Sequence, residues 1–291
     1  MNAKLPVGDT ISFIMRFAAT NIGLLLRVAW LPVVASLAGS ALIFGAFGLT
    51  DLAALQDDAM PAEPDAELMA LGYLLSFVGM LLFVPGFVIV TRKAAGGYAP
   101  PRGPFAGFRF GGRELRVIGA AILWYLLFVA FYIAAVLVFA VLGGGFFALA
   151  MSGESAMIGM GLVMVIAMLA LFGGLIFLFV RTMLFVPMAA VENRIALGDA
   201  WRATRGNFWR LLAVGLVLYA ALTGIYLVFA IIGVALFGIG GEAALAPGIA
   251  VLSLLAIPAY LFAYPLFLAF PGRAIAALRP MREDQAAAVF D

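Results

Sequence analysis

Six long apolar runs dominate the sequence and decide what it can fold into. Each exceeds the ~20 apolar residues that a helix needs to cross a hydrocarbon core about 30 Å thick. Hydrophobic residues make up 66% of the chain and charged residues 11%, against about 45–50% and about 25% in soluble domains. The sequence therefore predicts an all-α polytopic membrane protein, one domain over residues 1–291. The predicted spans cover residues 28–49, 68–90, 117–142, 157–180, 211–237 and 247–270.

The charged residues divide between the two ends of these spans. All 17 Lys and Arg fall in the N-terminal segment, in the connections at 92–116 and 181–210, or in the C-terminal tail, a side with net charge +10. The alternate loops at 50–67, 143–156 and 238–246 contain no basic residue and carry a net charge of −8. Because cytoplasmic loops are enriched in Lys and Arg, we expect a multi-pass membrane protein with both termini cytoplasmic.

The segments that precede the odd-numbered spans combine basic and aromatic residues. Residues 9–23 predict a short amphipathic helix whose apolar face includes Phe13, Ile14 and Phe17, with Arg16 beside it. A second basic-aromatic segment, FAGFRFGGRELR, ends the connection at 94–116. We expect amphipathic helices at the membrane surface before each odd-numbered span.

A spacing of 93 residues relates these segments to one another. Two sets of residues align at this spacing without gaps: Arg16, Arg109 and Arg202, and five residues later Asn21, Glu114 and Asn207. One interpretation is a threefold repeat of helical hairpins. The alternative is chance, because arginine is expected before any cytoplasmic start of a span.

Small residues within the spans predict where helices approach closely. Such clusters occur at Ala35 and Gly39, at Gly159 and Gly161, and at Gly173-Gly174. Membrane helices use small residues in this way because the two backbones can then come into contact.

Residues 181–212 form the most distinctive stretch, with five arginines, two carboxylates, a proline and two tryptophans. If Pro187 breaks the helix, the chain can fold back and pair Arg181 with Glu192 as a structural ion pair. The alternative is that Arg181 extends its head group to water while Glu192 is solvated. Tryptophan rings suit acyl-chain depth and guanidinium groups suit lipid phosphates. The residues predicted to contact anionic lipid or a partner protein are Trp201, Arg202, Arg205, Asn207, Trp209 and Arg210, together with Arg16, Arg109 and Arg113.

The same stretch resembles a known family. Arg181, Val186-Pro187, Glu192, Ala200 and the run Gly206-Asn207-Phe208-Trp209-Arg210 are similar to bacterial six-span proteins. That family comprises the membrane domain of glycerophosphoryl diester phosphodiesterases and related inner-membrane proteins of the YciC type. The resemblance implies a six-span fold and an association with lipid. It implies no activity, because such phosphodiesterases carry their chemistry in a separate soluble barrel with histidines and metal-binding carboxylates.

Composition restricts the chemistry further. The chain has no cysteine and no histidine, which excludes disulfides, thiolate nucleophiles and histidine-ligated metals. No ionisable residue lies near the middle of a predicted span, which counts against coupled transport and proton relays. We expect no catalytic, metal or cofactor site and no nucleic-acid partner.

Two functions stay open. The first is a non-enzymatic inner-membrane protein that contacts anionic lipids or a membrane complex, in envelope or lipid homeostasis or as an accessory subunit. The second is a transporter, channel or flippase for a lipid or another amphipathic molecule. An enzyme would have to draw an acid–base pair from Glu114, Glu192 or Asp199, which have simpler explanations.

Overall fold

The protein is described by a computed structural model that covers residues 4–46, 65–96, 98–100, 103, 105–150, 154–240 and 267–278. Every regular element of these residues is a helix, as predicted. The elements are α1 (Val7–Thr20), α2 (Ile22–Ala46), α3 (Ala66–Ala95), the 3-10 helix η1 (Ala106–Phe108), α4 (Gly112–Ala150), α5 (Glu154–Thr182), α6 (Phe185–Glu192), α7 (Leu197–Ala203) and α8 (Phe208–Gly240), with a further helical segment at Phe267–Leu278.

Five stretches of the described residues are helical, long and apolar enough to cross a membrane. They are Ile22–Ile43, Ala66–Ala95, Gly112–Gly145, Gly161–Glu192 and Phe208–Ile225. They correspond to the first five predicted spans and indicate a multi-pass membrane protein. The sixth predicted span, 247–270, lies outside the described residues except for its last four, which begin the helical segment Phe267–Leu278.

The third span is longer than its sequence suggested. The sequence predicted a span ending at residue 142 and a loop at 143–156, but α4 continues through the three glycines at 143–145 to Ala150 and contains 39 residues, about 58 Å at 1.5 Å per residue. A glycine costs a helix about 1 kcal/mol relative to alanine. In apolar surroundings the helix persists, because each backbone N–H and C=O must find its partner within the segment.

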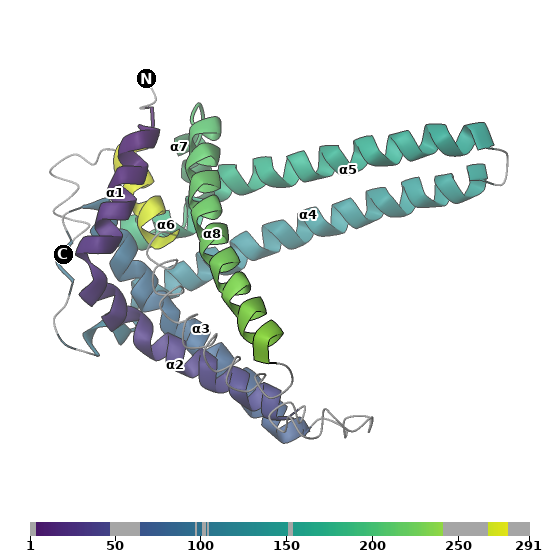
Figure 1. Ribbon diagram of the computed structural model, residues 1–291. Coiled ribbons are helices and arrows are strands. Elements are labelled where there is room, and N and C mark those ends of the chain that lie inside the picture. The colour runs from purple at the N-terminus through teal and green to yellow at the C-terminus, as the bar shows by residue number, and fades with distance from the viewer. Residues whose placement is uncertain are drawn as a thin grey trace.

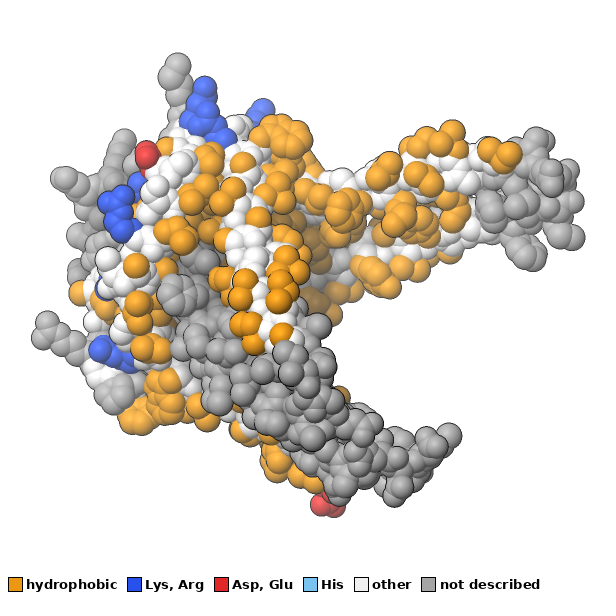
Figure 2. Space-filling view, viewed as in Figure 1, with side chains coloured by type: hydrophobic (Ala, Val, Ile, Leu, Met, Phe, Trp, Pro, Cys, Tyr) orange, Lys and Arg blue, Asp and Glu red, His pale blue; other side chains and the backbone are white. Residues whose placement is uncertain are grey.

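The helices form three arms that diverge from one end of the molecule (Figure 1). One arm is the antiparallel pair α2 and α3, the second is the pair α4 and α5, and α8 forms the third. The short helices α1, α6 and α7 gather where the arms meet. Apolar side chains cover the arms, whereas Lys and Arg lie at the end from which the arms project (Figure 2).

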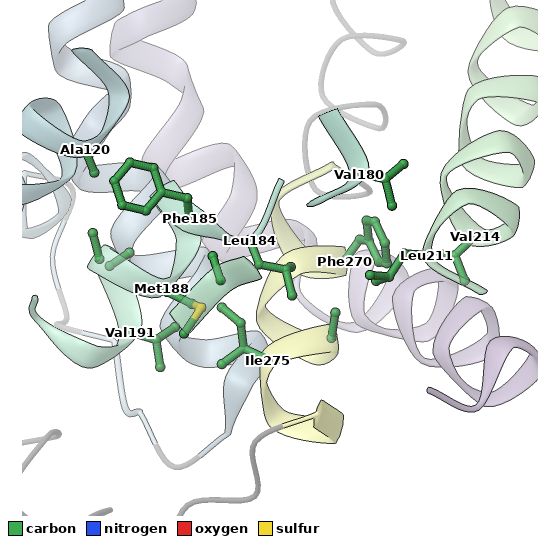
Figure 3. Packing of buried hydrophobic residues seen from close by; sticks show 14 of the residues in the cluster. Ala120, Val180, Leu184, Phe185, Met188, Val191, Leu211, Val214, Phe270 and Ile275 are labelled. Carbon is green, nitrogen blue, oxygen red and sulfur yellow. The ribbon is translucent and has the colours of Figure 1, made fainter. Parts of the chain in front are cut away.

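The buried core lies at this common end and is centred on α6. Six of the eight residues of this helix are buried: Phe185, Pro187, Met188, Ala189, Ala190 and Val191. The same cluster contains residues from both ends of the described chain and from α3, α4 and α8, including Leu5, Val88, Ala120, Leu211, Phe270 and Ile275. Figure 3 shows Phe185 beside Ala120 and Met188 beside Ile275. The chain breaks at 183–184 and not at Pro187, which lies within α6, and this helix is a packed centre and not a surface element.

Glycines bring α2 and α3 into backbone contact. Gly72, Gly79 and Gly86 recur at every seventh residue of α3 and all face α2. A Cβ atom added to Gly86 would lie 3.2 Å from the carbonyl oxygen of Val28, and one added to Gly39 of α2 would lie 2.7 Å from that of Gly72. The two helices thus leave no room for a side chain at these glycine positions.

The predicted close approach at Gly39 is confirmed, while among the described residues the other two glycine clusters do not mediate one. A Cβ atom added to Gly159, Gly161 or Gly173 would meet no described atom within 4 Å, and one added to Gly174 would lie 3.4 Å from Phe131. Their helix, α5, packs mainly through its C-terminal end, where Val180 enters the core. Small residues alone therefore did not identify which helix faces are in contact.

Candidate lipid- or partner-contact surface

The basic stretch after α6 folds as two helices joined by a turn. Asn193 has left-handed backbone angles (φ 55°) and ends α6, and Gly206 (φ 80°) separates α7 from α8. A single helix would have placed Trp201, Thr204 and Leu211 on one face. In the structure Thr204 and Leu211 are buried, whereas Trp201 is partly exposed. Trp201 and Thr204 both precede the turn at Gly206, so the difference in burial arises within α7 and its C-terminal cap.

Thr204 fixes α7 against the end of α5. Its hydroxyl lies 3.2 Å from the carbonyl oxygen of Arg181 and 3.1 Å from that of Ala200, within hydrogen-bond distance of both. The side chain is buried, so this polar group is satisfied inside the protein. The position of α7 therefore follows directly from the end of the fourth membrane helix.

Arg181 lies against aromatic rings. Its Cζ atom is 5.2 Å from the ring centroid of Trp201 and 5.3 Å from that of Phe177. Its NH1 group also donates to the Trp201 carbonyl oxygen at 3.4 Å. Contacts of a guanidinium group with aromatic rings are worth about 0.5–2 kcal/mol, depending on desolvation. Arg181 thus orients Trp201 at the protein surface.

Glu192 belongs to a chain of alternating charges. Arg194 contacts Glu192 at 2.8 Å and also pairs with Asp199, which in turn pairs with Arg202. The predicted pair of Arg181 with Glu192 is not among the ion pairs of the described residues. The left-handed turn at Asn193 reverses the chain after Glu192 and brings Arg194 onto it instead.

The charge chain turns its cations outward. The side chain of Asp199 is 11% exposed, whereas that of Arg202 is 77% exposed. Partial burial alone would lower the pKa of Arg194, but the hydrogen bond to Glu192 and the charges of Glu192 and Asp199 raise this pKa above its ordinary value. Arg194 is therefore held in its charged form on the outer side of the two carboxylates.

Asn207 and Arg210 bind the N-terminal segment of the chain itself. The Asn207 Oδ1 atom accepts the backbone N–H of Leu5 at 2.9 Å, and Arg210 NH1 donates to the carbonyl oxygen of Leu5 at 3.0 Å. Asn207 is only 1% exposed and Leu5 is fully buried. These two residues were expected to contact lipid or a partner. The structure assigns Asn207 to the interior and gives Arg210 an internal contact.

The start of α4 is held in a similar way. Arg113 NH1 donates to the carbonyl oxygen of Ala190 at 3.4 Å, and Arg116 NH1 donates to Asn193 Oδ1 at 2.6 Å. Both bonds join the start of α4 to the end of α6. Arg113, predicted as a contact residue, is therefore partly engaged within the fold, whereas Arg109 is exposed.

Six of the nine predicted contact residues are exposed at the end of the molecule where the arms meet. They are Arg16, Arg109, Trp201, Arg202, Arg205 and Trp209. Trp209 is 76% exposed although it is a large aromatic residue. We call these six residues the basic-aromatic surface. Figure 2 shows Lys and Arg side chains clustered at this end and absent from the visible apolar face of the α4–α5 arm.

Sequence reasoning missed three arginines that matter here. Arg194 and Arg116 join the charge chain and the α4–α6 contact, while Arg27 lies in a groove beside Trp30. The signal for Arg27 was present, because a cation after the start of an apolar helix is unusual. Among the described residues, no group of three or more His, Cys, Asp or Glu is placed to hold a metal ion.

Comparisons of the chain with protein-family models, with curated proteins and with solved structures find no match. The resemblance of residues 181–210 to the six-span family therefore stays a prediction. The arguments about function that follow depend on the geometry of this chain alone.

Proposed function

We propose that this chain is a non-enzymatic protein of a bacterial inner membrane, with both termini cytoplasmic, that contacts anionic lipids or a membrane partner complex through its basic-aromatic surface. Its role would be envelope or lipid homeostasis, or that of an accessory subunit. The six-span family resemblance and the threefold hairpin repeat belong to the same proposal. The observation that carries it is the exposure of Trp209, Trp201 and Arg202 at the basic end of an otherwise apolar molecule.

The chemistry of this surface suits the boundary between headgroups and acyl chains. Tryptophan is enriched at that level because its ring is apolar and its N–H is polar. A basic residue near an anionic leaflet contributes about 1 kcal/mol. Asp199 and Glu192, which lie beneath the arginines, fix Arg194 and Arg202 without occupying their outward sides. The outward-facing guanidinium groups of these two arginines are therefore positioned to bind phosphate groups.

The triple variant Arg16→Gln, Arg109→Gln and Arg202→Gln tests this role. We expect it to lower the ratio of anionic to zwitterionic lipid retained by the protein about tenfold. A tenfold change corresponds to about 1.4 kcal/mol, which is less than the roughly 3 kcal/mol that three fully effective cations would contribute. The measurement is native mass spectrometry of protein taken from nanodiscs of equal phosphatidylglycerol and phosphatidylcholine. The matched control replaces the same three residues with lysine, which keeps the charge.

Two outcomes of this experiment would redirect the proposal. A stoichiometric protein that is lost only in the glutamine variant would assign the surface to a partner complex. An unchanged lipid ratio together with unchanged protein recovery would contradict the proposed role. Lipid transport by the membrane helices would then become the leading alternative.

The orientation can be tested separately, because the chain has no cysteine of its own. Single cysteines at Glu67, at the start of α3, and at Gly198 of α7 would both be exposed. With a membrane-impermeant maleimide on intact spheroplasts, we expect Glu67→Cys to react and Gly198→Cys to react only after the membrane is opened. The reverse pattern would place the basic-aromatic surface outside the cytoplasm.

A further inference from the structure

An open groove lies at the start of α2, and its lining includes none of the basic-aromatic surface residues. It is lined by Gly23, Leu26, Arg27 and Trp30 of α2 and by Gly103 of the connection after α3. Its volume is about 520 Å³, within the range of about 300–1,000 Å³ that is usual for small-molecule sites. The groove combines a single cation with apolar and aromatic walls.

Packing holds the walls of this groove in place. The ring of Trp30 meets the rings of Phe105 and Phe108 edge-on, at centroid distances of 5.9 and 6.1 Å. The 3-10 helix η1 lies close to α2, since a Cβ atom added to Gly107 would be 3.4 Å from Val28. Trp30 is thus fixed beside the groove, with 37% of its surface still exposed.

Glycines keep the groove open. A Cβ atom added to Gly23 would meet nothing within 4 Å, so the space above this residue is empty of protein among the described residues. On the opposite wall Gly103 has a φ of 113°, a left-handed conformation that favours glycine. The backbone therefore borders the groove directly, and its polar groups lie near any ligand that enters.

Arg27 is the cation of the groove, and it lies inside an apolar helical stretch that begins at Ile22. No hydrogen bond, ion pair or ring contact joins Arg27 to another described residue. A guanidinium group in such surroundings is costly unless an anion or water satisfies it. It binds phosphate well, because two parallel N–H groups can meet two oxygen atoms.

An apolar ridge continues from the groove along α2. Leu26, Trp30, Val34 and Leu37 share one face of the helix and are all exposed. The opposite face, which includes Val28 and Gly39, packs against α3 and η1. An acyl chain could follow this ridge into the membrane.

We propose that this groove binds one phospholipid with an anionic headgroup. Its phosphate meets Arg27, the rest of the headgroup occupies the space between Gly23 and Gly103, and one acyl chain lies along the ridge from Leu26 to Leu37. The inference rests on the proposed function for the choice of an anionic lipid, but it uses none of the residues of the basic-aromatic surface.

Native mass spectrometry after stepwise removal of lipid by detergent tests the site. Wild-type protein from phosphatidylglycerol and phosphatidylcholine nanodiscs should retain one phosphatidylglycerol molecule after the surrounding lipid has left. We expect Arg27→Gln to reduce the occupancy of this lipid at least about tenfold. The matched control, Lys4→Gln, also removes one exposed cation but lies outside both the groove and the basic-aromatic surface, and it should retain the lipid.

A second variant separates the site from general damage to the fold. Gly23→Leu fills the groove without changing the charge, and the free space at this position should accept the side chain. It should also lose the retained lipid while showing wild-type behaviour on size exclusion. Retention of the lipid by both variants would overturn the proposal, as would its displacement by excess inorganic phosphate, which would indicate a site for a free anion.

The same measurement distinguishes this proposal from the proposed function. If the triple glutamine variant of the basic-aromatic surface changes nothing while Arg27→Gln loses the retained lipid, the groove is a lipid site and the surface is not. If the triple variant loses its anionic lipids while Arg27→Gln keeps the single retained molecule, the surface binds lipid and the groove does not.

Discussion

Replacing Gly39 with valine is expected to separate α2 from α3. A Cβ atom at this position would lie 2.7 Å from the carbonyl oxygen of Gly72 and 2.8 Å from the backbone nitrogen of Ser76. Backbone atoms cannot move aside as the end of a long side chain can, so the two helices must shift apart. Overpacking typically costs 1–3 kcal/mol, and we expect about 3 kcal/mol here because both neighbours are backbone.

Unfolding in mixed micelles of dodecylmaltoside and SDS, followed by far-UV circular dichroism, would measure this loss. Gly173→Val is the matched control, because Gly173 also lies in an apolar membrane helix but meets nothing within 4 Å. The control should unfold within about 0.5 kcal/mol of wild type, as surface substitutions usually do. Equal unfolding of the two variants would mean that the glycine seam of α3 is not a tight contact in the membrane.

Asn207→Ala is expected to release the N-terminal segment from the core. The change leaves the buried N–H of Leu5 without the acceptor that it has at 2.9 Å. An unsatisfied buried donor costs about 1–3 kcal/mol. We therefore expect a loss of about 2 kcal/mol in the free energy of unfolding and faster hydrogen exchange over Leu5 and the first turn of α1.

Deletion of residues 1–5 gives the control for this prediction. Once Leu5 is absent, Asn207→Ala leaves no Leu5 N–H without an acceptor, so its cost should fall by about 1 kcal/mol or more. The difference between the two backgrounds measures the coupling of Asn207 with the N-terminal segment. If Asn207→Ala costs the same in both backgrounds, its effect does not act through Leu5.

The membrane helices could be predicted because the signal is local. A run of more than about 20 apolar residues needs no distant partner to become a helix, since its backbone is satisfied within the segment. The helix ends were less certain. The glycines at 143–145 looked like a stop and are continuous helix in α4, because their effect depends on the surroundings.

The candidate site was harder to predict because its contacts join distant residues. The exposed members, such as Trp209 and Arg202, follow from the pattern of aromatic and basic residues. Asn207 belongs to the same pattern, yet its partner is Leu5, 202 positions away. For Arg181, the attraction of opposite charges suggested Glu192. The rings of Phe177 and Trp201 are its partners instead. The left-handed turn at Asn193 explains this difference, because it places Arg194 and not Arg181 beside Glu192.

The composition of the core has a consequence for how the protein is made. The cluster around α6 includes Leu5 near the start of the chain and Ile275 near its end. During synthesis α2 and α3 can insert into the membrane and pack against each other early, because the two helices are consecutive in the sequence. Other helices cover part of the cluster earlier, but the contribution of Phe270, Ala274 and Ile275 is added only when Phe267–Leu278 has been synthesised. A chain that lacks this segment would therefore keep its membrane helices and leave that side of the core exposed.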